Sequence, residues 1–349
     1  MADTRFTALG MSGSGKTCYV LGMYYEMCVG VRKFNLVTTN SNASLLEEWM
    51  DKLDDEIGMN RFPSGTALTE VTDYSFKLNY ENQYIFEFDW MDYGGGTLKQ
   101  RENNPKAFDS LNKSIEESTA LYIFIDGELL AEEDFDKQLK NVQRKAARTI
   151  NSYITNFAQA NEGYMPPIVF VITKSDLCAP YLNEGDMQKI IKEAFSPAFG
   201  QGTKNYIVAV SLGKEISDDD YSGEVEPINI HVPFFLGIYH EFFNYCRWLK
   251  QKIEQDIELN KSNISYNNYI INKQNNRFFS FLRDNHAINQ SRKNIINAEQ
   301  EIEQLESQLK SEKRLLFAVV SELDKMSSKF ITFVDGKEVD FSHDEIMDF

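Results

Sequence analysis

The stretch Gly-Met-Ser-Gly-Ser-Gly-Lys-Thr, residues 10–17, decides the fold of this chain. It has the pattern G-x-x-x-x-G-K-[ST] and lies between an apolar run, Arg5–Leu9, and a predicted helix, Lys16–Val29. Glycines let successive backbone N–H groups point at a phosphate chain, and the helix N-terminus adds its positive dipole end. Lys16 would reach the phosphate oxygens and the Thr17 hydroxyl would bind Mg²⁺. The alternative, a glycine-rich turn with an exposed lysine, is less favoured in this context.

Short apolar runs rich in β-branched and aromatic residues recur with helical stretches between them, which predicts buried parallel strands joined by crossover helices. Val71–Tyr80 and Tyr84–Trp90 are separated by only three residues, so they are predicted to form an antiparallel hairpin. The predicted parallel strands are Arg5–Leu9, Leu121–Ile125, Ile168–Ile172 and Tyr206–Val210. The predicted helices are Lys16–Val29, Ser44–Asp55, Glu132–Ala160, Glu184–Phe195 and Pro233–Asp256. We therefore expect an α/β fold with a mostly parallel sheet and one antiparallel strand.

A second motif indicates which base the chain binds. Thr173-Lys-Ser-Asp176 follows the strand Ile168–Ile172 and resembles the [NT]-K-x-D motif of GTPases. Guanine presents an N1–H and an N2 amine that one carboxylate, Asp176, can accept together, while the stem of Lys174 covers the base plane. Adenine offers neither donor there. Ser211 and Leu212, at the end of the next strand, resemble the loop that contacts guanine O6.

Two further segments complete a set of five motifs. Asp92–Gly95 has the pattern D-x-x-G at the end of the second hairpin strand, and Arg61–Thr66, Arg-Phe-Pro-Ser-Gly-Thr, looks like a first switch loop. Taken in their order along the chain, over about residues 5 to 213, the five motifs resemble those of the Ras-like P-loop GTPases of the TRAFAC class. They resemble those of bacterial TRAFAC-clade GTPase domains more loosely. The resemblance implies a six-stranded, mainly parallel sheet that binds GTP or GDP with Mg²⁺.

The resemblance also implies the site residues. The metal-binding residues would be Thr17, Thr66 and Asp92, with Thr69 and Thr72 as alternatives to Thr66. The catalytic residues would be Lys16, Thr66, Gly95 and Arg61, where Arg61 is either an arginine finger or a solvated surface arginine. The nucleotide-binding residues would be Gly10, Ser12, Gly13, Ser14, Gly15, Lys16, Thr17, Cys18, Thr173, Lys174, Asp176, Ser211 and Leu212.

One departure bears on hydrolysis. GTPases that act unaided usually carry Gln directly after D-x-x-G, whereas this chain has Gly96. Thr97, Gln100, Arg61 or a partner protein would then orient the attacking water. We expect a Mg²⁺-dependent GTPase switch, slow without a protein effector or activating partner. The alternative is a non-hydrolysing pseudo-GTPase scaffold, and an ATP-dependent kinase or motor would require residues 173–176 to match by accident.

Composition limits the other partners. Thirty-six basic and 53 acidic residues leave a net charge of −17, which argues against nucleic acid or anionic membrane as a general partner. No apolar run is long enough to span a bilayer, and residues 1–9 lack the pattern of a signal peptide. Both features predict a cytoplasmic location, and the four scattered cysteines form no C-x-x-C pair. Six acids between Glu215 and Glu226 predict a solvated surface loop.

The sequence after the motifs predicts a helical extension. We expect a GTPase domain over residues 1–256, an Asn-rich linker or helix extension over 257–285, an amphipathic helix or coiled coil over 286–328 and a short hairpin with an acidic tail over 329–349. Apolar residues recur every seven positions from Phe281 to Leu323, although Asp284, Ser291, Ala298 and Glu312 are poor d positions. This stripe forms either an intermolecular coiled coil and a homo-oligomer, or a helix folded against the GTPase domain.

Overall fold

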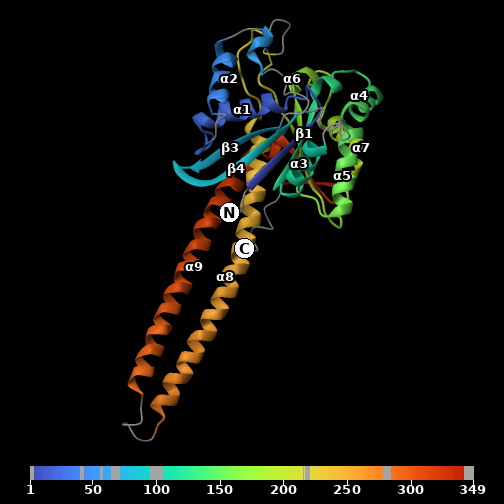
Figure 1. Cartoon of the computed structure of the whole chain (residues 1–349). Helices are drawn as coiled ribbons and strands as arrows, with labels where there is room; N and C mark the ends of the chain where they lie inside the picture. The colour runs from blue at the N-terminus through green and yellow to red at the C-terminus, as the bar shows by residue number, and fades with distance from the viewer. Residues whose placement is uncertain are drawn as a thin grey trace. The chain divides into compact units, whose positions relative to one another are not determined.

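The predicted strands form one mixed sheet (Figure 1). The computed structural model describes residues 4–39, 43–55, 58–63, 71–94, 105–214, 216, 221–277 and 284–341. Within these residues the sheet has nine strands in the order β2-β3-β4-β1-β5-β6-β7-β8-β9. Their bounds are β1 (Thr4–Gly10), β2 (Phe34–Thr38), β3 (Val71–Tyr80), β4 (Gln83–Tyr93), β5 (Ala120–Asp126), β6 (Ile168–Thr173), β7 (Lys204–Ala209), β8 (Phe330–Val334) and β9 (Lys337–Val339).

The expected count of six strands is wrong, whereas the α/β class with a mostly parallel centre is confirmed. β4, β1, β5, β6 and β7 are parallel neighbours, and β3 pairs antiparallel with β4 as predicted. The three additional strands are β2, which extends the sheet beyond β3, and β8 and β9, which extend it beyond β7. The predicted C-terminal hairpin does form, with Asp335 and Gly336 at positive φ in its turn, but it also joins the central sheet through β8.

Helices cover both faces of the sheet in the described residues. One face packs against α3, α4, α5 and α7, whose apolar side chains share a core with Leu9, Ile123 and Phe170 (Figure 1). The other face is aromatic, and Phe6 and Phe88 contact Phe234 at the start of α8. The bounds are α1 (Lys16–Val29), α2 (Ala43–Asp55), α3 (Pro105–Glu116), α4 (Phe135–Val142), α5 (Arg148–Ala160), α6 (Ser175–Cys178), α7 (Glu184–Ala194), α8 (His231–Asn275) and α9 (Asn285–Lys325).

The bounds predicted from the sequence agree with the structure for most of these helices. The helix predicted over residues 132–160 is interrupted by a π-helical segment, Gln143–Ala147, between α4 and α5. α8 runs 19 residues beyond the predicted end at Asp256, so the Asn-rich segment is helical through Asn275. No helix of the described residues is apolar over a length that could cross a membrane.

The chain divides into two compact units. One consists of Met1–His240 and Glu322–Ser342, and the other of Glu241–Ser321 and His343–Phe349. In the second unit α8 and α9 lie side by side as a helical hairpin (Figure 1), and Nδ2 of Asn294 donates a 3.3 Å hydrogen bond to the side-chain Oδ1 of Asn267. Ser291 and Ala298 are buried, which explains their small size at these d positions. Within this unit α9 therefore packs along α8 of the same chain.

Candidate functional site

Three parallel strands deliver the predicted motifs to one edge of the sheet. β1 ends at the glycine loop, β4 ends at Asp92 and Tyr93, and β6 ends at Thr173. Residues Ala8 and Asp92 are paired across β1 and β4, so the two motifs lie side by side. The carboxyl ends of parallel strands are where doubly wound sheets bind ligands. A cavity of about 360 Å³ opens at this edge.

The glycine loop has the backbone conformation that its sequence predicts. Gly13 and Gly15 have φ values of 82° and 79°, a region that residues with a Cβ atom rarely adopt. A Cβ atom on Gly15 would also lie 3.1 Å from the Thr173 side chain. Because α1 begins at Lys16, the loop presents the N-terminus of a 14-residue helix to the cavity.

Lys16 is folded back on its own loop. Its Nζ donates hydrogen bonds to the Gly10 and Met11 carbonyl oxygens at 3.1 and 3.3 Å. Burial lowers the pKa of Lys16, while the Asp92 carboxylate acts in the opposite direction. Among the described residues its hydrogen-bond partners are these two carbonyl groups, and a buried ammonium favours a nearby anion.

Thr17 and Asp92 come together as a pair of oxygen ligands. The Thr17 hydroxyl donates a 2.7 Å hydrogen bond to Oδ2 of Asp92, whose side chain is fully buried. A hydroxyl and a carboxylate in contact are a donor set that Mg²⁺ accepts, so these residues fit the implied metal. Thr72 is the cross-strand partner of Asp92 in the β3–β4 pair, while Thr66, Thr69 and Gly95 lie outside the described residues.

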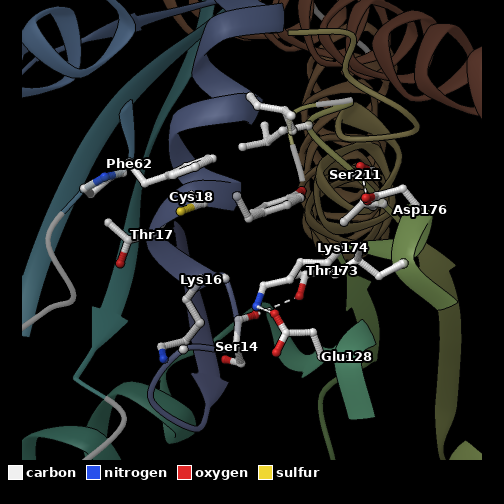
Figure 2. Close-up of a pocket in the computed structure, with 18 of the residues that line it drawn as sticks. Ser14, Lys16, Thr17, Cys18, Phe62, Glu128, Thr173, Lys174, Asp176 and Ser211 are labelled. Atoms are coloured by element: carbon white, nitrogen blue, oxygen red, sulfur yellow. Dashed lines mark hydrogen bonds and ion pairs between the residues drawn. The ribbon is translucent and has the colours of Figure 1, made fainter. Parts of the chain in front are cut away.

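Thr173 connects the base motif to the phosphate loop (Figure 2). Its hydroxyl donates hydrogen bonds to the main-chain carbonyl oxygens of Ser14 and Ile125, at 3.0 and 3.2 Å. Thr173 and Ser14 are buried. The Thr173 side chain, at the end of β6, therefore connects the end of β5 to the phosphate loop.

The Asp176 carboxylate is only half satisfied. Its Oδ1 accepts a 2.5 Å hydrogen bond from the Ser211 hydroxyl, which also accepts one from the Gly213 N–H at 3.1 Å (Figure 2). Its Oδ2 is buried and has no hydrogen-bond partner among the described residues. Asp176, Ser211 and Leu212 all line the cavity. The site thus holds one carboxylate oxygen in place and leaves the second to a donor from a ligand.

Lys174 is held by two carboxylates, neither of which the motifs predicted. Its backbone is left-handed, with φ of 48°, and its Nζ lies 3.1 Å from Asp126 Oδ2 and 2.8 Å from Glu128 Oε1. Burial opposes the charge of Lys174, but these two partners raise its pKa overall. Glu128 lines the cavity (Figure 2). Its position just after a predicted strand at this sheet edge was the available indication.

An apolar wall closes the base end of the cavity. Phe62, Ile216 and Tyr221 line it, and the Phe62 and Tyr221 rings meet edge to face at 5.6 Å. Ile216 and Tyr221 belong to the acidic segment that was expected to be a solvated loop. That expectation is wrong for these two residues, because the segment returns to the sheet through a bridge between Ser211 and Ile228.

Arg61 is not a solvated residue, and it is not among the described residues that line the cavity. It is 4% exposed, and its guanidinium donates to the main-chain carbonyl oxygens of Leu53, Tyr221 and Gly223. The surface alternative is therefore wrong, and the structure does not support an arginine finger. Arg61 instead joins the end of α2 to the segment that carries Tyr221. Sequence could not indicate this because Gly223 is 162 residues away.

The fold and the site together define a P-loop nucleotide-binding protein. Residues 7–172 match the model of the Double-GTPase 1 family, which supports a P-loop GTPase-type domain. This match covers the phosphate loop and Asp92 and ends directly before the Thr173–Asp176 motif. No curated protein matches the chain.

Proposed function

We propose that the chain binds Mg²⁺-GTP, hydrolyses it to GDP and reports the nucleotide state to a protein partner. The observation that carries this proposal is the buried Oδ2 of Asp176 in the cavity of the phosphate loop, which has no hydrogen-bond partner in the described part of the chain. A buried acceptor without a donor costs about 1–3 kcal/mol. Guanine would supply its N1–H and N2–H to this carboxylate, whereas adenine presents no donor pair there.

The residues around the cavity would divide the remaining work. Lys16 would exchange the Gly10 and Met11 carbonyl oxygens for the β- and γ-phosphate oxygens, where its charge is compensated. Thr17 and Asp92 would hold Mg²⁺, whose positive charge would neutralise the phosphate oxygens. The stem of Lys174, fixed by Asp126 and Glu128, would cover one face of the base.

The switch itself would involve the two segments that follow Pro63 and Tyr93. A γ-phosphate would attract Thr66 and the Gly95 amide, and its loss would release both. Because Gly96 replaces the usual glutamine, we expect slow hydrolysis that a partner accelerates. Binding of that partner would favour one nucleotide state over the other.

A second function is favoured by Gly96 and by the helical hairpin of α8 and α9. A protein that holds GTP without hydrolysing it would be a nucleotide-dependent scaffold, and the hairpin offers a long surface for assembly. This pseudo-GTPase shares the guanine site but not the chemistry, so binding and hydrolysis have to be measured separately.

Guanine recognition is tested by titrating the purified protein with fluorescent GDP, GTP, ATP and xanthosine triphosphate in Mg²⁺. Asp176→Asn should lose affinity for GTP and gain affinity for the xanthine nucleotide, because xanthine carries a carbonyl where guanine carries the N2 amine. Asp136→Asn, at an exposed aspartate of α4, is the matched control. Equal or tighter binding of ATP by the wild type would refute the guanine assignment.

Hydrolysis is tested by phosphate release from pre-bound GTP in a single turnover, with Lys16→Ala as the negative control. Release that requires Mg²⁺ supports the GTPase. Selective binding of GTP with no release over hours, alone or with cell extract as a source of partner, would support the scaffold instead.

A further inference from the structure

A stripe of side chains, exposed except for the half-buried Tyr245, follows one face of α8 in the second unit. Its members alternate spacings of three and four residues: Tyr245, Trp248, Lys252, Gln255, Leu259, Ser262, Tyr266, Tyr269 and Lys273. We name this set the α8 stripe. Four of its large side chains are 53 to 63% exposed, namely Trp248, Leu259, Tyr266 and Tyr269. This spacing is the pattern of a helix that packs along a second helix.

α9 does not cover the stripe. Between Tyr245 and Lys273 the buried residues of α8 are Cys246, Leu249, Ile253, Asn260 and Asn267. Each comes one position after a member of the stripe, and consecutive residues of a helix point about 100° apart. The stripe therefore lies beside the α8–α9 seam and is available to another helix.

The order of residues along the stripe is self-complementary. Leu259 is at its centre, and Tyr245 lies 14 residues before it while Lys273 lies 14 after it. Lys252 and Tyr266 lie seven residues before and after the same leucine. The distances of Trp248 and Tyr269 from Leu259 along the sequence also agree to within one residue. When the helix is reversed, each lysine therefore meets a tyrosine and Leu259 meets itself.

We propose that the α8 stripes of two copies of this chain pack antiparallel about a twofold axis at Leu259. A twofold interface requires a surface that complements itself, which this order provides. The stripe spans four heptads, long enough for a helix pair of about 42 Å. A parallel pair is disfavoured because Lys252 and Lys273 would each face their own copies.

The lysines already take the position that this interface needs. The Lys252 Nζ lies 5.2 Å from the centre of the Trp248 ring, and the Lys273 Nζ lies 5.9 Å from that of Tyr269. Tyr245 and Trp248 are stacked at 5.9 Å. A tyrosine ring of the second copy would contact each ammonium group on the side away from its present aromatic ring. A cation–π contact becomes stronger when water is removed from it. This inference is independent of nucleotide chemistry.

The test measures the mass of the full-length protein in solution by light scattering and sedimentation equilibrium over a dilution series. Wild type should form dimers, and Leu259→Glu should raise the dimer dissociation constant by about tenfold or more, because two carboxylates would meet at the axis. Ile296→Glu is the matched control, since Ile296 of α9 is also exposed, at 53%, and lies outside the stripe. Thermal melts should show that both variants fold.

Cross-linking tests the register. Leu259→Cys should give a disulfide-linked dimer under mild oxidation, whereas Lys261→Cys, also exposed on α8, and the wild type should not. A monomeric wild type, or a dimer that Leu259→Glu leaves intact, would overturn the proposal. Binding of the monomer to lipid vesicles that depends on Leu259 would also overturn it, in favour of a membrane surface.

Discussion

The hydroxyl of Thr173 donates a 3.0 Å hydrogen bond to the main-chain carbonyl of Ser14, within the phosphate loop. Both residues are buried, at 5% and 3% exposure, so water does not compete for this contact. The side chain that opens the base motif thus sets the position of the loop for the phosphates. In the function proposed above, this hydroxyl would connect recognition of the base with recognition of the phosphates.

Thr173→Val keeps the shape of the side chain and removes this donor. We expect GDP and GTP to bind about tenfold more weakly, because a hydrogen bond of this kind contributes about 1 kcal/mol and the Ser14 carbonyl loses its partner. The preference for GTP over ATP should persist, since Asp176 is unchanged. Titration with both nucleotides measures the effect, and Thr173→Ser should restore binding. Wild-type affinity in Thr173→Val would contradict this connection.

Ser211→Ala removes the donor to Oδ1 of Asp176 and leaves the carboxylate in place. Guanine nucleotides should bind about three- to tenfold more weakly, a smaller loss than in Asp176→Asn, while ATP binding should not change. Ser152→Ala, at an exposed serine of α5, is the control. An equal loss for ATP would mean that Ser211 supports the whole cavity and not base recognition.

Arg61→Lys distinguishes a structural arginine from a catalytic one. A lysine cannot reach the three carbonyl groups together, so the free energy of unfolding should fall by about 2 kcal/mol. Denaturant unfolding measures this, with Arg144→Lys at an exposed position as the control. A variant of unchanged stability that has lost GTP hydrolysis would restore the arginine finger.

His240 gives the stability of the sheet unit a pH dependence. Burial, with a smaller effect of Lys204, lowers the pKa of His240 to about 3, and its Nε2 lies 2.9 Å from the Tyr206 hydroxyl. In the unfolded chain the imidazole would bind a proton near pH 6.5. Between these two pH values the unfolded state binds more protons than the folded state. The free energy of unfolding should therefore decrease as the pH is lowered, by at most about 1.4 kcal/mol per pH unit.

Unfolding curves between pH 7 and pH 4 test this dependence. The slope should become shallower in His240→Gln, whereas the same substitution at exposed His286 should leave it unchanged. A steep slope that persists in His240→Gln would assign the effect to other groups.

Sequence predicted the parts of the site whose signals are local. The glycine loop, the start of α1 and the strand before Thr173 each follow from neighbouring residues, and the structure brings Thr17, Asp92, Asp176 and Ser211 to one sheet edge. Gly13 and Gly15 needed positive φ, which their residue type already allows.

The parts that sequence missed depend on distant partners. β8 was taken as an isolated hairpin strand because its neighbour β7 lies more than 120 residues earlier. Arg61 was misplaced for the same reason, since its acceptors Tyr221 and Gly223 follow another strand. Ser291 and Ala298 seemed poor positions for a coiled coil until α8 supplied a close partner.

The pairing of β8 with β7 means that the C-terminal segment is not an appendage. Both ends of the helical hairpin belong to elements of the sheet unit, so the hairpin is an insertion between two adjacent strands. A chain truncated after residue 256 would lose β8 and expose the backbone N–H and C=O groups of β7. Such an open strand edge, flanked by the buried side chains of Ile207 and Val208, would recruit other chains and precipitate the protein.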